Sequence, residues 1–215
     1  STVTARGFVY GTSQGDLNQT ASCGTGTGSM TYTLSGLRQG TTYYYKAYAT
    51  NSVGTSYGEL KTFDTPCQIN GHEYVDLGLP SGKLWATCNV GASRPTDVGG
   101  RYQYTTVTWG GGWTMPTRAD FQELIGSCSY VRTTENGQLG YRFTGPNGRS
   151  IFMPCSIYSN NGCYWSSTIS GTSGAYGSAY YYLYLPANSG SLNIDSGNYG
   201  TSYNYGIRPV CPAQN

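Results

Sequence analysis

Residues 164–210 read YWSSTISGTSGAYGSAYYYLYLPANSGSLNIDSGNYGTSYNYGIRPV, a composition unlike the rest of the chain. Between Ser166 and Tyr205 the sole formal charge is Asp195, and Tyr, Ser, Gly, Asn, Ala and Thr predominate. Disordered segments are poor in aromatic residues, whereas this stretch is rich in tyrosine. Tyrosine gives rigid contact area and Ser, Gly and Asn give adaptable hydrogen bonds, as in antibody paratopes. The stretch predicts a binding face. A Tyr-rich sheet edge without a partner is the alternative, because aromatic residues also favour strands.

The composition of the whole chain predicts a mostly β protein with one clear helix. Its 215 residues include 32 Gly and 22 Tyr, and 10% are charged, while helical periodicity is almost absent. The net charge of +2 is too small to indicate nucleic acid as a partner. No apolar run reaches the length of a membrane span, so membrane insertion is not expected.

The seven cysteines are Cys23, Cys67, Cys88, Cys128, Cys155, Cys163 and Cys211. They contain no Cys-x-x-Cys pair, and His72 is the one histidine, so neither a metal site nor any other cofactor is predicted. An extracytoplasmic setting would allow disulfides among Cys155, Cys163 and Cys211. Buried free thiols remain the alternative.

Residues 1–66 predict short strands at Ala5–Gly11, Met30–Leu34, Thr42–Ala49 and Gly58–Phe63. The segment Leu34–Tyr43 resembles the corner before the penultimate strand of fibronectin type III domains, where a Tyr hydroxyl returns to the backbone upstream. The resemblance covers about residues 3–63 and lacks two strands that usually come first. It implies a partial immunoglobulin-like sandwich acting as a spacer, either trimmed or completed by another chain or domain.

Residues 67–215 predict strands at Glu73–Leu79 and Lys83–Val90, then a helix with Thr117 as its N-cap and Gly126 as its end. Two further strands, Leu139–Thr144 and Ser150–Pro154, flank a Gly-Pro-Asn-Gly turn. The turn-rich segment 91–112 is left unassigned.

Five motifs carry a second resemblance: GHEYVDLGLPSG with LWATCNVGA (71–92), WTMPT (113–117), SIFMP (150–154), YWSS (164–167) and IRPV (207–210). They are similar to a C-type-lectin-fold domain of Bacteroidetes and Fibrobacter surface proteins. The same fold serves the variable proteins of diversity-generating retroelements. The resemblance implies a C-type-lectin-like α+β domain whose variable region is 166–205.

Retroelement diversification restricts the residue types that can occur in this region, so the sequence can be compared with that restriction. Adenine-directed change of AAC or AAT codons never yields Lys, Glu, Gln, Trp or Met. None of those five types occurs between Ser166 and Tyr205. Low complexity alone would also give this result, so a fixed Tyr-rich domain stays open.

The residue types divide the region into framework and contact positions. Trp165, Ala179, Leu183, Leu185 and Leu192 are expected to anchor it to the core, and Arg208 is expected to be structural. Tyr180, Tyr182 and Tyr184 alternate and would share one side of a strand, although the register is not fixed by sequence. The predicted ligand-binding residues are Tyr176, Tyr180, Tyr182, Tyr184, Asn188, Asn193, Asp195, Tyr199, Tyr203, Asn204 and Tyr205.

No catalytic site is predicted. The acids form no pair at a telling spacing, and Asp120 with Glu123 is interpreted as a solvated helix face; His72 is expected in a turn or at the surface. Cys163 and Cys211 lie where the related formylglycine-generating enzymes carry a cysteine pair, but those enzymes' Trp-Glu-Trp and Arg-Gly-Gly-Ser segments are missing. The sugar-binding tripeptides of calcium-dependent lectins are also missing.

The sequence therefore predicts a non-catalytic receptor-binding or adhesin-type protein. Its ligand would be a cell-surface protein or glycan, and its location a bacterial surface, a pilus or a phage tail. Upstream domains or a partner subunit are compatible with this hypothesis. The alternative is a fixed structural or interaction domain of a bacterial surface or pilus assembly.

Overall fold

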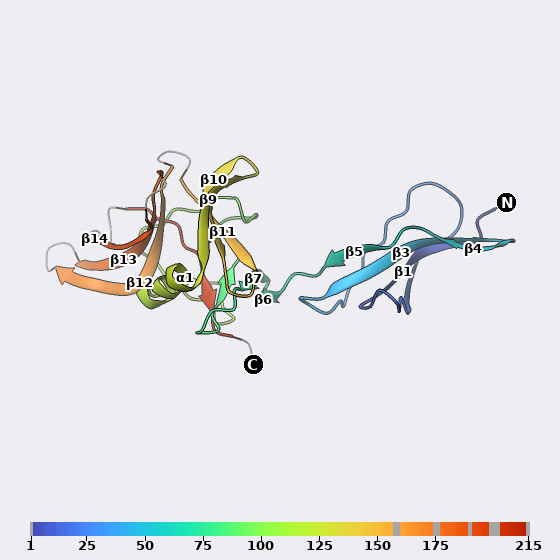
Figure 1. The fold of residues 1–215 in the computed structure, drawn as a ribbon, viewed down its shortest axis with the longest axis horizontal. Coiled ribbons are helices and arrows are strands. Elements are labelled where there is room, and N and C mark those ends of the chain that lie inside the picture. Colours follow the sequence, from blue (N-terminus) through green and yellow to red (C-terminus); the bar gives the residue numbers. More distant parts are fainter. Residues whose placement is uncertain (1, 157–159, 174–176, 189–190, 198–202, 214–215) are drawn as a thin grey trace. The chain divides into compact units, whose positions relative to one another are not determined.

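The computed structural model describes residues 2–156, 160–173, 177–188, 191–197 and 203–213. In these ranges the chain is mostly β with one helix, which confirms the predicted fold class (Figure 1). It divides into two compact units, Ser1–Cys67 (unit 1) and Gln68–Asn215 (unit 2). A helix long and apolar enough to cross a lipid bilayer is absent from the described ranges.

Unit 1 is one antiparallel sheet with the strand order β2-β1-β3-β4, in which β5 also pairs with β3. Its strands are β1 (Ala5–Gly11), β2 (Gln19–Ser22), β3 (Thr42–Asn51), β4 (Gly54–Tyr57) and β5 (Lys61–Asp64). The predicted bounds of β1 are confirmed. Aromatic rings tie the strands together: Tyr43 and Phe63 stack with centroids 5.6 Å apart, and Phe8 meets Tyr45 edge-on at 6.1 Å.

The predicted strand at Met30–Leu34 is wrong, because residues 30–34 have no regular secondary structure. Alternating apolar residues supply a face, but a strand also needs a neighbour for its ladder. The side chains of Met30 and Leu34 instead line a hollow of about 540 Å³ together with Phe8 and Phe63. Conversely, β2 and β4 are polar or glycine-containing segments that form strands because β1 and β3 offer them free edges.

The expected tyrosine corner is present in unit 1. The Tyr43 hydroxyl accepts a hydrogen bond from the Arg38 backbone N–H at 3.1 Å, and the Tyr43 side chain is buried. This bond fixes the chain where it enters β3.

We expect Tyr43→Phe to lower the stability of unit 1 by about 1 kcal/mol, because the Arg38 N–H loses its acceptor while the ring stays in place. Hydrogen exchange of the β1 and β3 amides measures the change. Tyr57→Phe, at an exposed ring (58% exposed) in the same unit, is the matched control and should have no effect. Equal exchange in both variants would contradict a stabilising corner.

Unit 2 contains three further antiparallel sheets. The first, ordered β15-β8-β7-β6, joins β6 (Gln68–Ile69), β7 (His72–Asp76), β8 (Leu84–Ala86) and β15 (Val210–Cys211). The second, ordered β11-β10-β9, joins β9 (Ser129–Glu135), β10 (Gln138–Thr144) and β11 (Ser150–Pro154). The third joins β12 (Gly162–Ser173), β13 (Gly177–Leu185) and β14 (Asn193–Gly197) in chain order.

The helix α1 (Arg118–Ser127) packs against β12, β13 and β14 (Figure 1). Thr117 is its N-cap, as predicted, and forms a capping box with Asp120. The interpretation of Asp120 as solvated is wrong: it is 7% exposed and forms an ion pair with Lys83 at 3.3 Å. The helix passes through the predicted stop at Gly126 and ends one residue later.

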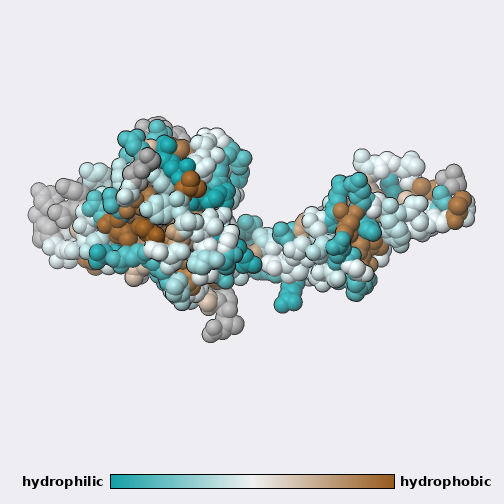
Figure 2. Space-filling model, in the orientation of Figure 1, coloured by the Kyte–Doolittle hydropathy of each residue, from teal (hydrophilic) through white to brown (hydrophobic). Residues whose placement is uncertain are grey.

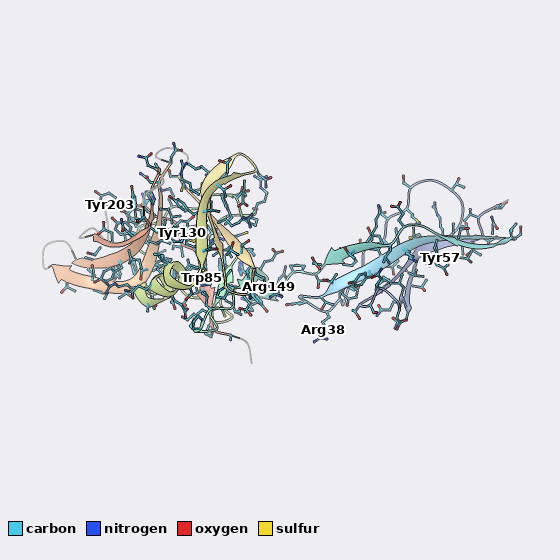
Figure 3. The ribbon with its side chains drawn as sticks, viewed as in Figure 1. Arg38, Tyr57, Trp85, Tyr130, Arg149 and Tyr203 are labelled. Carbon is cyan, nitrogen blue, oxygen red and sulfur yellow. The ribbon has the colours of Figure 1, made fainter. Side chains whose placement is uncertain are left out.

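The core of unit 2 lies between α1 and the three sheets. Trp85, Phe121 and Leu183 are fully buried in it, and the Trp85 and Phe121 rings lie 5.9 Å apart. Trp85 is labelled in the middle of the unit in Figure 3. On the surface shown in Figure 2, an apolar patch lies over the region where α1, β13 and β14 meet, and its surroundings are mostly hydrophilic.

Candidate functional site

The alternation of β13 separates a core side from an outer side. Ala179, Leu183 and Leu185 are buried, whereas Tyr180, Tyr182 and Tyr184 are half-buried on the opposite side. The structure thus places the alternating tyrosines on the outer side, and it confirms the framework role of Trp165 and Leu192, which are 2% and 7% exposed.

Among the described residues, six aromatic rings on this outer side are connected by ring contacts, and we call them the tyrosine platform. Its members are Tyr104, Trp165, Tyr180, Tyr182, Tyr203 and Tyr205. Trp165 lies at its centre, with its ring centroid 4.4 Å from that of Tyr205 and 6.5 Å from those of Tyr180 and Tyr182. Aromatic contacts of this kind add to the stabilisation from burial alone. The platform is therefore a stiff surface.

Two further ring contacts extend the platform beyond the rings around Trp165. Tyr104 stacks on Tyr180 with centroids 3.3 Å apart, and Tyr203 lies 5.9 Å from Tyr205. Tyr203 is 46% exposed and is labelled beside β14 in Figure 3. Tyr203 is therefore the most exposed ring of the platform.

The platform carries one carboxylate. The Tyr182 hydroxyl donates to Asp195 at 3.3 Å across the β13–β14 pair. Burial first, and then the neighbouring Asp195 charge, raise the pKa of Tyr182 to about 12, and burial also raises the pKa of Tyr205. At neutral pH these phenols are therefore neutral donors for hydrogen bonds.

We expect the stability of unit 2 to fall as the pH rises from 10 towards 12. Because the folded pKa of Tyr182 exceeds the ordinary value of 10.0, the unfolded chain loses this proton first, and ionisation favours unfolding in that window. Urea unfolding at pH 8, 10 and 11 measures the effect. Tyr182→Phe should show a shallower fall, with Tyr130→Phe, an exposed tyrosine on β9, as control. An unchanged slope in Tyr182→Phe would contradict this assignment.

The predicted ligand-binding residues fall into three groups in the structure. Asn188, Asn193, Asp195, Tyr203 and Asn204 are exposed. Four more are half-buried and not fully exposed: Tyr180, Tyr182, Tyr184 and Tyr205. For Tyr180, Tyr182 and Tyr205 the cause is the large Trp165 indole, which gives their rings an apolar surface to pack on. Tyr176 and Tyr199 lie outside the described residues.

Sequence reasoning missed Tyr104, which lies in the unassigned segment 91–112. The segment is brought to the platform by Tyr102, whose backbone pairs with that of Tyr205 and whose carbonyl accepts the Trp165 indole N–H at 2.8 Å. The alternating Tyr-Gln-Tyr at 102–104 was the available signal.

Hydrogen bonds connect β12, which carries Trp165, to the start of α1. A bulge in β12 lies between Trp165 and Ile169. There the Ser167 N–H donates to the Pro116 carbonyl at 2.8 Å, and the Thr168 hydroxyl accepts the Arg118 N–H at 2.9 Å. On the core side of β13, the Arg118 guanidinium covers the Tyr181 ring at 4.6 Å.

The cysteines and the one histidine of the chain are at least partly buried. None of the seven cysteines, all of which lie in the described ranges, forms a disulfide, and burial raises the pKa of Cys163 and of Cys155 to about 11. His72 is the first residue of β7 and not a turn residue; its ring stacks on Trp109 at 3.6 Å, and burial lowers its pKa. Among the described residues, no three His, Cys, Asp or Glu side chains group as metal ligands would.

The chain matches no protein-family model, no curated protein and no solved structure.

Proposed function

We propose that unit 2 is a non-catalytic binding domain that holds a cell-surface protein or glycan against the tyrosine platform and the exposed residues beside it. The observation that carries this proposal is the gathering of Trp165, Tyr180, Tyr182, Tyr203 and Tyr205 on one side of a sheet whose other side is core. Rigid aromatic rings bordered by Asn, Ser and Asp side chains are the chemistry of protein paratopes.

The thiols support a role without catalysis. Reactive cysteines have a lowered pKa, whereas burial raises those of Cys155 and Cys163, so both are protonated at neutral pH. A function in binding also fits the sequence resemblance to C-type-lectin-like variable proteins, and on that resemblance the proposed location is a bacterial surface, a pilus or a phage tail.

Retroelement diversification is part of the proposal, and the structure sharpens its test. Deep sequencing of the gene and its flanks in a natural population should find substitutions within codons 166–205, a near-copy of that stretch and a reverse transcriptase gene nearby. Within β13 the substitutions should fall at Tyr180, Tyr182 and Tyr184, while Ala179, Leu183 and Leu185 stay apolar because they are buried.

An invariant stretch without a template copy would contradict diversification and leave a fixed binding site. Variation spread equally over both sides of β13 would contradict the division into core and contact positions. A stable homo-oligomer that buries the exposed Tyr203 would instead favour the alternative, a permanent contact within a surface assembly. Size-exclusion chromatography of the wild type beside Tyr203→Ser distinguishes these cases, and a monomer is expected for both.

A further inference from the structure

A pocket of about 350 Å³ opens beside the tyrosine platform, and we call it the side pocket. Its apolar wall comes from Tyr104, Val107, Trp113 and Met115. Thr106, Thr114, Thr117 and Ser167 complete the lining with hydroxyl-bearing side chains. No charged residue lines the pocket, although α1 begins next to it.

Three of the four hydroxyl groups that line the side pocket form hydrogen bonds within the chain. The Thr117 hydroxyl bonds Asp120 at 2.8 Å, and the Thr114 and Ser167 hydroxyls donate to the carbonyls of Val210 and Pro116. The Trp113 indole N–H donates to Ile69 at 3.0 Å. The donor protons of these three hydroxyls are therefore already used, and a ligand entering the pocket meets the apolar atoms of Tyr104, Val107, Trp113 and Met115.

The side pocket and the platform share a wall. Tyr104 lines the pocket, and its ring stacks on Tyr180 at 3.3 Å, so this one ring belongs both to the pocket and to the platform. Interfaces between proteins concentrate binding energy where an anchor side chain fills such a pocket next to aromatic residues.

We propose that the side pocket receives an apolar side chain of a polypeptide, and that the ligand of the tyrosine platform is therefore a protein and not a glycan. A sugar placed here would lose water from its hydroxyls against an apolar wall whose neighbouring hydroxyls already donate within the chain, which is unfavourable, whereas an alkyl or aromatic side chain gains from leaving water. This inference rests on the proposed binding function of the platform and selects between its two ligand classes.

The first experiment follows the methyl NMR signals of Met115 and Val107 in the full chain. N-acetyl-leucinamide and indole are the apolar probes, and methyl glycosides of common hexoses are the saccharide probes. Saturable shifts with the apolar probes alone are expected. Shifts with the glycosides alone, or with neither class, would overturn the proposal.

The second experiment selects binders of the full chain from a displayed random-peptide library. Val107→Thr keeps the shape of the side chain but replaces one methyl group by a hydroxyl. It should lower the affinity of the selected peptides by about tenfold. Val131→Thr, at a valine of β9 that is 57% exposed, is the matched control and should have no effect. Thr106→Glu, at an exposed position of the pocket mouth, provides a second variant that does not disturb the core.

The outcomes separate this inference from the proposed function. If Tyr203→Ser lowers the affinity of the selected peptides but Val107→Thr and Thr106→Glu do not, the proposed role of the side pocket is overturned. The platform then remains a binding site. Binding of glycosides that depends on Tyr203 would overturn the ligand class alone. Peptides and glycosides that both fail to bind, with unmoved methyl signals, would contradict the inference and the proposed function together.

Discussion

Arg208→Lys is expected to lower the free energy of unfolding of unit 2 by about 3–5 kcal/mol, the range for breaking the contacts of a buried charge. Arg208 is 0% exposed, and its guanidinium donates to the carbonyls of Ala86, Thr87 and Phe152, at 3.0 Å for Ala86 and 2.8 Å for Phe152. Lysine keeps the buried charge, but its compact ammonium cannot reach all of these carbonyls. The two sheets that contain Ala86 and Phe152 then lose the hydrogen bonds through which Arg208 connects them.

The matched variant is Arg208→Met, which removes the charge as well as the donors. Burial already lowers the pKa of Arg208, and no carboxylate contributes to that shift, so methionine relieves an unfavourable burial of charge. We expect Arg208→Met to be less destabilising than Arg208→Lys. Guanidinium unfolding followed by tryptophan fluorescence reports on unit 2 alone, because all four tryptophans lie there. The reverse order of stability would contradict this account.

Trp165→Ala is expected to lower the free energy of unfolding of unit 2 by about 3–5 kcal/mol and to abolish the packing of the rings in the tyrosine platform. The indole is 2% exposed, contacts the rings of Tyr180, Tyr182 and Tyr205, and donates its N–H to Tyr102. Its removal leaves a cavity beneath these rings, and the Tyr102 carbonyl loses the bond from the indole while it keeps the bond from the Tyr205 N–H. Ligand affinity should fall with stability, because a contact surface without its support must pay for ordering on binding.

Two controls define the Trp165 result. Trp165→Phe keeps an aromatic ring but loses the N–H, so a smaller loss of stability is expected. Ile169→Ala, at a β12 residue that is 52% exposed, should change the free energy of unfolding by less than about 0.5 kcal/mol. Unfolding curves and the dispersion of the tyrosine ring signals in NMR measure both effects. A Trp165→Ala protein with unchanged ring signals would show that the platform does not depend on Trp165.

Local chemistry made parts of the fold predictable. The bounds of β1 and the N-cap Thr117 follow from residue type over a few positions, and both were found as predicted. Met30–Leu34 failed because a strand is a property of two segments, and the sequence pattern describes only one. The polar strand β9 was missed for the same reason: β10 supplies its partner in space.

The part of the candidate site that could be predicted is the part set by the alternation of side chains along a strand. Tyr180, Tyr182 and Tyr184 share one side of β13 because side chains alternate along a strand. Tyr104 was not predictable, since it reaches the platform through the backbone pairing of Tyr102 with Tyr205 across the fold. The half-burial of the tyrosines depends in turn on the position of Trp165, which no local pattern gives.

The strand directions in unit 1 determine how it responds to mechanical load. β1 begins at Ala5, opposite Thr50 near one end of β3, and β5 ends at Asp64, opposite Thr42 at the other end (Figure 1). A pull on the two ends of unit 1 therefore runs along the strands, across ladders whose hydrogen bonds are perpendicular to it. The bonds of each ladder bear the load together in shear instead of opening one after another, which gives unit 1 resistance to traction.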